Sequence, residues 1–294
     1  MSVGIITSPH ASLGCPLIAI TSPLGQIASG IENLLQQGAG LSFNSLMTAN
    51  HFRTALVASG ILIALSSVSN AQTPSDFGIR TGQILYQSAM ASEQNVKDWV
   101  MEGPGRLTFD DSWMSMESPD EEMHHVYWCP ETFPSRFVAQ WEMQNQNMDA
   151  GLCIVFFAAT GLKGEDVMDT SLPKRDGTFS QYNNQALQNY HISYYARTPK
   201  LPARPVARLR KNPGKNIVQE GPPGIEVSSD RPHKITLIKE DAHIRLFIDE
   251  RLIIDWIDPG EINGAPLGSG KIGLRQMQWT RFRYRNFKVW AVQN

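Results

Sequence analysis

The stretch that most constrains the fold is Leu152–Ala159, in which every side chain is apolar. Successive side chains of a strand point to opposite faces, so an apolar run of this length is typical of a central strand that is covered on both sides. Phe137–Met143 alternates instead: Phe137, Ala139, Trp141 and Met143 share one face, and Val138, Gln140 and Glu142 share the other. The two patterns predict a core between sheets.

Further short runs rich in β-forming residues follow one another along the chain. They are Ile84–Met90, Arg106–Phe109, His124–Trp128, Asn189–Arg197, Lys234–Lys239, Ile244–Ile248, Leu252–Trp256, Lys271–Met277 and Phe282–Val292. Residues 160–188 and 198–232 are predicted as long irregular stretches, which in a compact domain are usually functional or disordered. No convincing amphipathic helix follows Ala71. We therefore expect an all-β protein, a sandwich or jelly roll.

The N-terminal segment has a different composition from the rest of the chain. Residues 1–71 contain only two charged side chains, Glu32 and Arg53, and Arg53 precedes an apolar run, Thr54–Val68. The small-x-small sequence that ends at Ala71 completes the pattern of a secretory signal peptide. The run is too short and too rich in Ser and Ala to be a convincing membrane span.

Three segments follow from this pattern. We expect residues 47–71 to be the signal peptide and residues 72–294 to be a single jelly-roll domain. A signal peptide begins at the N-terminus, so Met47 is the hypothetical true start, and residues 1–46 are translated upstream sequence or a disordered extension. The protein is then exported to the periplasm or beyond the cell, with no membrane partner after removal of the signal.

Charge and cysteine content narrow the class of protein further. The chain has 26 Lys and Arg residues against 28 Asp and Glu residues. A nucleic-acid-binding protein would show a basic excess or patch, so we expect no nucleic-acid partner. Cys129 and Cys153 remain after residue 71; export would allow a disulfide, and the apolar strand around Cys153 equally favours two buried free thiols.

The strand Asn189–Arg197 carries the densest set of reactive side chains. Strand alternation places His191, Ser193, Tyr195 and Arg197 on one face, opposite Ile192, Tyr194 and Ala196. Such a face could line a groove for a polar polymer, or it could be an ordinary solvated face.

Seven sequence blocks occur in an order that resembles one bacterial family. They are Asp98–Gly105, Tyr127–Glu131, Gly151–Ala159, Gly164–Asp166, Tyr190–Tyr195, Leu209–Gly214 and Gly270–Met277. The chain resembles the YesU-like family, a domain of unknown function with a concanavalin A-like (lectin/glucanase) jelly roll. The resemblance implies a curved β-sandwich whose concave face meets carbohydrate. It also implies an association with enzymes that degrade pectin-like polysaccharides containing uronic acids.

Two enzyme patterns known on that fold are not matched. Retaining glucanases carry Glu-x-Asp-x-x-Glu on one strand, and this spacing does not occur here. Alginate-lyase-like members carry Gln-x-His, whereas Gln188 lies three residues before His191.

β-Elimination on a uronate, the first functional hypothesis, needs a base, an acid and a cation to neutralise the carboxylate. His191 and Tyr195 are the candidate base and acid. Candidate substrate-binding side chains, chosen for charge or for a polar position within an apolar strand, are Arg197, Arg210, Lys211, Arg275 and Gln276.

Two alternatives remain open. Hydrolysis needs paired carboxylates; Glu142, which shares a face with Gln140, and the loop residues Glu165 and Asp166 are the candidates. A non-catalytic carbohydrate-binding module would instead stack sugars on Trp128, Trp141, Trp256 or Trp279.

Cofactor and metal signals are weak. His124 and His125 would point to opposite faces of a strand, so they could not bind one ion together. We expect no cofactor and no catalytic metal, although the acidic residues 120–122 could hold a structural calcium ion. The expected partner is a carbohydrate polymer or oligosaccharide.

Overall fold

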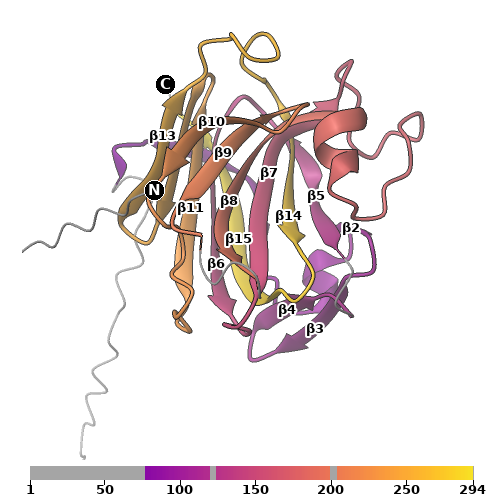
Figure 1. Cartoon of the computed structure of the whole chain (residues 1–294), viewed down its shortest axis with the longest axis vertical. Helices are drawn as coiled ribbons and strands as arrows, with labels where there is room; N and C mark the ends of the chain where they lie inside the picture. Colours follow the sequence, from indigo (N-terminus) through magenta and orange to yellow (C-terminus); the bar gives the residue numbers. More distant parts are fainter. Residues whose placement is uncertain (1–76, 120–123, 199–203, 294) are drawn as a thin grey trace, which may run out of the picture. The chain divides into compact units, whose positions relative to one another are not determined.

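The computed structural model describes residues 77–119, 124–198 and 204–293. Their strands form two antiparallel sheets (Figure 1). The eight-stranded sheet has the order β13 (Arg251–Ile257), β12 (His243–Ile248), β11 (His233–Glu240), β6 (Arg136–Asn145), β15 (Arg281–Val292), β4 (Trp113–Glu117) and β3 (Arg106–Asp110), with β1 (Thr81–Ser88) also paired to β15. The seven-stranded sheet has the order β10 (Asn216–Gly221), β9 (Ala207–Asn212), β8 (Leu187–Arg197), β7 (Gly151–Gly161), β14 (Gly270–Gln276), β5 (His125–Phe133) and β2 (Val100–Glu102).

The main core lies between the two sheets. Trp141 of β6 and Leu237 of β11 are buried there together with Ile192 of β8 and Val155 of β7. Apolar side chains on the inner face of every central strand remove a large area from water, which is the main stabilising contribution in a sandwich of this kind. The all-β prediction is confirmed.

The second apolar cluster covers the outer face of the seven-stranded sheet. Phe156 of β7 and Trp128 of β5 are buried under Val167 and Tyr182, which belong to the long loop 162–186. This loop contains the short π-helical turn η6 (Gln181–Gln185), drawn in red in Figure 1. Strand β7 is therefore covered on both faces, as its unbroken apolar run predicts.

A buried ion pair anchors this loop to the sheet. Arg175 Nη2 lies 2.6 Å from Glu102 Oε1, with the two side chains 5% and 11% exposed. Arg175 Nε donates to Glu102 Oε2, which also accepts from Trp128 Nε1 at 2.9 Å. The covering loop is thus fixed at the edge strand β2.

The prediction of an irregular stretch at 198–232 is wrong, because it contains β9 and β10. The inward side chains of β9, Ala207 and Leu209, alternate with Arg208 and Arg210. The basic residues at every second position obscured the alternation of apolar side chains that would have predicted a strand. The hairpin of β9 and β10 forms one edge of the seven-stranded sheet.

Strand β3 confirms the predicted strand Arg106–Phe109, but its hairpin partner β4 is a second element that the sequence analysis missed. Asp110 pairs with Trp113, so Asp111 and Ser112 form a two-residue turn. Both have positive φ values, 48° and 63°, as a type I′ turn requires. Asp-Ser is a weaker signal for this turn than Asn-Gly, so the sequence did not reveal it.

Several expectations concern parts of the chain that the structure does not describe. The upstream segment 1–46, the signal peptide 47–71 and the acidic residues 120–122 lie outside the described residues. Within the described residues, Cys129 and Cys153 are both buried free thiols. No helix in the described ranges is long and apolar enough to cross a membrane.

Candidate binding site on the seven-stranded sheet

Strand register assembles the site from residues far apart in the chain. On the outer face, Arg210 of β9 lies opposite His191 of β8, which lies opposite Phe156 of β7. In the neighbouring row, Ser193 of β8 lies opposite Ile154, which in turn lies opposite Arg275 of β14. Two adjacent rows thus bring basic and polar side chains from three strands to one area, with the apolar Phe156 and Ile154 of β7 between them.

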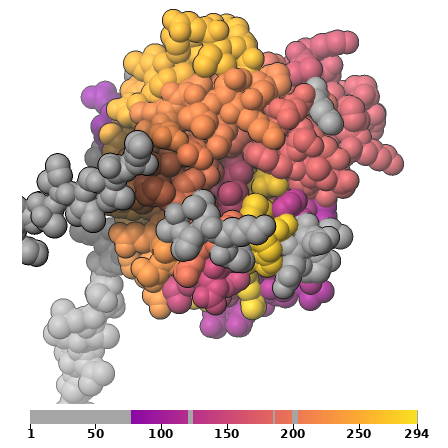
Figure 2. Space-filling view, in the orientation of Figure 1, coloured from indigo at the N-terminus to yellow at the C-terminus, as the bar shows by residue number. Residues whose placement is uncertain are grey.

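A pocket of about 410 Å³ opens over these rows. Figure 2 shows the hollow between the orange β9–β10 hairpin and the red loop 162–186. We call it the basic pocket; its lining residues are His124, Leu152, Ile154, Phe179, Ser193, Arg204, Arg210, Lys215, Ile217, Arg275 and Met277.

Four of the described lining residues are cationic, and none of the described lining residues is a carboxylate. Among the described residues, Arg204, Arg210, Lys215 and Arg275 form no ion pair. Burial lowers the pKa of Arg275 and that of Arg204 to about 10, so both guanidinium groups remain charged at neutral pH. The described lining of the pocket therefore carries an excess of positive charge.

Arg275 is the most unusual of these cations, because its side chain is only 2% exposed. Its Nε has no hydrogen-bond partner within the described ranges. Burying a charge without a counterion is costly, and such groups concentrate at functional sites. The sequence singled out Arg275 for its charge within an apolar strand, and the structure places it on the pocket floor.

Phe179 forms the wall between the pocket and the covered half of the sheet. The guanidinium carbon of Arg275 lies 4.6 Å from the centroid of its ring, and Lys215 Nζ lies 5.5 Å from it. These are cation–π distances, which stabilise the two charges without neutralising them. The same ring meets the imidazole of His191 edge to face at 5.6 Å.

His191 itself is fully buried beside the pocket rather than lining it. The amide of Asn212 donates to its Nδ1 at 2.7 Å and also donates to Asn189 Oδ1. Both amide protons are thereby used, so Nδ1 accepts and Nε2 carries the ring proton. Burial, with Arg210 and Arg275 nearby, holds the pKa of His191 well below its usual value.

His124 is the imidazole that does line the pocket. Its Nδ1 accepts a hydrogen bond from the backbone N–H of Gln278 at 3.2 Å. Burial, reinforced by the charge of Arg275, lowers the pKa of His124 to about 4. At neutral pH this ring is also uncharged, and its protonated nitrogen is Nε2, a hydrogen-bond donor.

The predicted common face of His191, Ser193, Tyr195 and Arg197 is not formed. Cys153 pairs with Tyr195 but its neighbour Ile154 pairs with Ser193, so β8 has a bulge at Tyr194. The bulge turns Tyr195 into the core, where Asn145 Nδ2 donates to its hydroxyl at 3.0 Å. The catalytic role assigned to Tyr195 therefore has no support from its position.

Arg197 follows the bulge and also lies away from the pocket. Its Nη1 donates to the backbone carbonyl of Met148 at 2.5 Å. The structure thus brings His191 and Ser193 toward the site and leaves Arg197 outside it.

Two further predicted substrate-binding residues point into the sandwich. Lys211 is fully buried and its Nζ lies 2.7 Å from Asp258 Oδ2, while it also donates to the carbonyls of Gly264 and Ala265. Gln276 is fully buried beside Tyr284, with 2.8 Å between the side-chain amide and the hydroxyl. Each follows a pocket arginine by one position, so alternation directs it to the opposite face.

The candidate carboxylates do not meet. Glu142 lies on β6 of the other sheet, where Arg285 Nη2 is 2.6 Å from it, and its neighbour Gln140 donates to Thr236 Oγ1 at 2.9 Å. Glu165 accepts from the backbone N–H of Lys163 in its own loop.

Asp166 belongs to the same loop as Glu165. It accepts from Thr132 Oγ1 at 3.1 Å and lies 3.3 Å from Lys271 Nζ. All four predicted polar residues of the hydrolase hypothesis are outside the basic pocket.

The described residues contain no group of three or more His, Cys, Asp or Glu side chains that could hold a metal ion. Sequence reasoning missed several lining residues: His124 as a pocket residue, Phe179, Arg204 and Lys215. The alternation in β9 could have revealed which face Arg210 occupies. The contributions of Phe179 and Arg204 depend on loop paths that no local pattern specifies.

Fold and pocket together define a concanavalin A-like β-sandwich with a basic pocket on the outer face of one sheet. Residues 83–289 match the domain of unknown function DUF1961. The chain is also 37% identical over 213 residues to the uncharacterized protein YesU of Bacillus subtilis (strain 168), covering 71% of this chain and 96% of YesU. The protein therefore belongs to the DUF1961 family.

Solved structures agree on the fold. A crystal structure of a protein of unknown function with a galectin-like fold from Bacillus subtilis has a TM-score of 0.70 and 35% identity, covering 73% of this chain and 98% of that chain. The exoplasmic/lumenal domain of VIP36, bound to Ca²⁺ and Man3GlcNAc, has a TM-score of 0.50 and 10% identity, covering 72% and 92%. The latter likeness concerns the fold alone.

Proposed function

We propose that the protein binds an acidic carbohydrate and that the carboxylate of a uronic-acid unit occupies the basic pocket. The observation that carries the proposal is Arg275, an almost fully buried cation with no ion pair among the described residues. A ligand carboxylate would supply the missing counterion through charge-assisted hydrogen bonds. Arg204 and Arg210, which line the same pocket, would add to the attraction.

The size and walls of the pocket favour a sugar over a small ion. Its volume of about 410 Å³ is within the range of small-molecule sites. Phe179, Ile217 and Met277 provide apolar surface beside the cations. A pyranose presents both kinds of surface, since its C–H groups form apolar patches between its polar groups. The domain of VIP36, which shares the fold, was crystallised with bound Man3GlcNAc.

Binding without chemistry is the function that this set of groups supports best. Elimination would need a base at the C5 proton of the uronate. The two imidazoles beside the pocket, His124 and His191, use Nδ1 as an acceptor and keep a proton on Nε2. Among the described residues, no carboxylate lines the pocket. Lyase activity, which the sequence favoured, is therefore an outcome to be tested beside binding.

The test is calorimetric titration of the full chain with oligogalacturonates and oligoglucuronates. Arg275→Gln keeps a polar side chain of similar reach and should weaken binding at least about ten-fold, the loss of one charge-assisted contact. Arg283→Gln is the matched control, because Arg283 lies in the eight-stranded sheet, away from the basic pocket, where it stacks over Trp113. Equal affinity of the wild type and Arg275→Gln would contradict the proposal.

Ultraviolet absorbance during the same incubations tests for elimination. Loss of the C5 proton and cleavage of the C4–O bond would leave a C4–C5 double bond conjugated to the carboxylate, and the leaving oxygen would take up a proton. A rise in absorbance would add lyase chemistry to binding. Constant absorbance with measurable affinity would leave a binding module.

We further propose that the protein is exported. The basis is the sequence pattern from Met47 to Ala71 together with a polysaccharide ligand, which a cell meets outside its cytoplasm. N-terminal sequencing of the protein from the producing cell should begin near Gln72. A mature protein that still contains residues 1–46 would contradict this proposal.

A further inference from the structure

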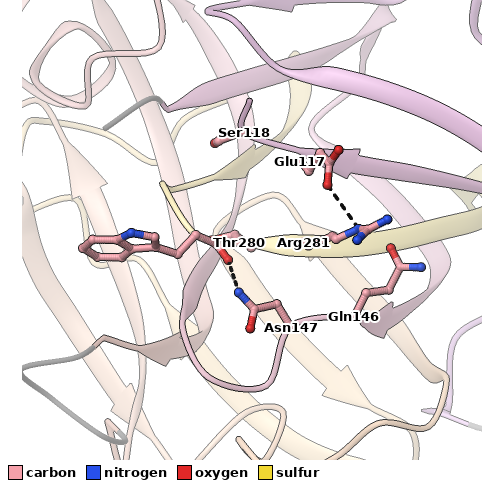
Figure 3. A pocket seen from close by; sticks show the side chains of 7 residues that line it. Glu117, Ser118, Gln146, Asn147, Thr280 and Arg281 are labelled. Carbon is pink, nitrogen blue, oxygen red and sulfur yellow. Dashed lines mark hydrogen bonds and ion pairs between the residues drawn. The ribbon is translucent and has the colours of Figure 1, made fainter. Parts of the chain in front are cut away.

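A second pocket lies at one end of the sandwich, beside the turn that joins β14 to β15. Its volume is about 380 Å³. The lining residues are Glu117, Ser118, Gln146, Asn147, Trp279, Thr280 and Arg281 (Figure 3). Figure 3 shows Glu117 and Arg281 turned toward one another, and Arg281 Nε lies 3.1 Å from Glu117 Oε2. The two charged side chains that line this pocket therefore neutralise each other.

Trp279 has an unusual backbone conformation in this pocket. Its φ is +65°, in the left-handed region that bulky side chains rarely adopt. Thr280 N donates to Met277 O at 3.1 Å, so Trp279 is the third residue of a β-turn, where a positive φ normally selects Gly or Asn. Asn147 Nδ2 holds the strained residue by donating to its carbonyl at 2.7 Å.

Strain of this kind costs of order 1–3 kcal/mol, persists only where the surrounding structure imposes it, and is concentrated at active sites and ligand-binding sites. The Trp279 indole is only half-buried, and it forms no ring stack or cation–π contact with any described residue. It contributes little to the core, so stability does not explain its presence. An indole beside amide and hydroxyl groups is a combination that suits a sugar ring.

The two pockets are lined by residues of one and the same turn. Met277 lines the basic pocket, and Trp279 and Thr280 line the second pocket. Thr280 Oγ1 accepts from the backbone N–H of Leu152, which lines the basic pocket, at 2.8 Å. The Cα atoms of the first and last residues of a β-turn lie within about 7 Å of each other. Adjacent units of one oligosaccharide could therefore reach both pockets.

We propose that the pocket at Trp279 is a second saccharide subsite, which takes an uncharged pyranose next to the uronate in the basic pocket. This inference rests on the proposed function. The neutralised Glu117–Arg281 pair and the amide of Gln146 select hydroxyl groups rather than a second carboxylate. The ligand class is then a mixed oligosaccharide in which a uronic-acid unit is linked to a neutral unit.

The test compares a free uronate monosaccharide with disaccharides of a uronate and a neutral sugar, titrated into the full chain. The wild type should bind a disaccharide at least about ten-fold more tightly than the monosaccharide. Trp279→Ala should remove that gain and leave the affinity for the monosaccharide within about two-fold. Trp279→Phe keeps an aromatic face and should retain most of the gain.

Trp279→Gly separates the effect of losing the indole on ligand binding from any effect on the stability of the fold. Glycine adopts a positive φ without strain, so this variant should melt at the same or a higher temperature than the wild type. It should nevertheless lose the gain in disaccharide affinity, as Trp279→Ala does. A variant that melts normally and retains the full gain would overturn the subsite.

The monosaccharide titration keeps the two proposals apart. If the uronate binds and the disaccharide binds no more tightly, the second subsite is wrong and the basic pocket stands. If an all-uronate disaccharide gains as much as the mixed one, the preference for an uncharged unit is wrong. Absence of binding by both ligands would reject the proposed function and this inference with it.

Discussion

The guanidinium carbon of Arg275 lies 4.6 Å from the centroid of the Phe179 ring. Arg275 belongs to a central strand, and Phe179 belongs to the loop that covers half of the same sheet. The cation therefore depends on the loop for its closest stabilising contact. Any change that displaces the loop should alter the basic pocket, although the sheet beneath it stays intact.

Phe179→Leu should weaken uronate binding, because it retains apolar bulk and removes the ring face that orients Arg275. Cation–π contacts contribute about 0.5–2 kcal/mol, which corresponds to roughly two- to thirty-fold in affinity. Titration calorimetry measures the change. Phe247→Leu is the control, since Phe247 stacks on Phe77 in a separate cluster. Equal losses in both variants would contradict a specific role for Phe179.

Arg275→Met should separate stability from binding. Replacing a buried, unpaired charge by an apolar side chain of similar length should raise the free energy of unfolding by about 1–2 kcal/mol. The same change should abolish uronate binding. Urea denaturation of the full chain gives the first quantity. A less stable variant would show that the cation has a structural partner.

Glu102→Gln should release the covering loop. It leaves the buried Arg175 without its counterion, a change that costs about 3–5 kcal/mol in comparable buried pairs. Hydrogen exchange should rise in residues 162–186 and remain low in β11. Glu220→Gln breaks the more exposed pair with Arg208 and should cost less than about 1 kcal/mol. Similar effects of the two substitutions would argue against the anchoring role.

Acid should destabilise the fold at pH values well above the pKa range of its carboxyl groups. Burial, with the charges of Arg275 and His124 nearby, lowers the pKa of His125 to about 3, and burial lowers the pKa of His191 well below its usual value. Both imidazoles are neutral when folded and take up protons on unfolding below about pH 6.5. Stability is therefore fully present above that pH and falls as the pH drops.

His125 should contribute a slope of about 1.4 kcal/mol per pH unit between about pH 6 and pH 4, and the lowered pKa of His191 adds to the slope in the same direction. His125→Leu removes one titrating group and should lower the slope by about one proton. Unfolding free energies measured across this range give the number directly. An unchanged slope would mean that His125 is already charged in the folded protein.

Residue patterns in the chain predict the sandwich well and the site only in part. The unbroken apolar run Leu152–Ala159 is a local pattern, and it predicted a strand that is covered on both faces. Arg275 stood out as a charge within an apolar strand. The bulge at Tyr194 depends on pairing with the neighbouring strand β7, so alternation alone placed Tyr195 on the wrong face.

Lys211 shows a different limit of sequence reasoning. Its charge suggested a substrate contact, but Asp258, 47 positions further along the chain, is its partner inside the fold. Phe179 reaches the site through a loop path that is set by tertiary contacts, namely the packing of Val167 and Tyr182 and the ion pair of Arg175 with Glu102. Site residues supplied by tertiary contacts of this kind have no local pattern to reveal them.

The most direct test of the central claim compares one oligouronate with its methyl ester, titrated into the wild-type full chain. Esterification removes the charge and keeps the sugar ring and its hydroxyl groups. A carboxylate held by Arg275 predicts that the ester binds at least about ten-fold more weakly. Equal affinity for the acid and its ester would contradict the assignment of the basic pocket as a uronate site.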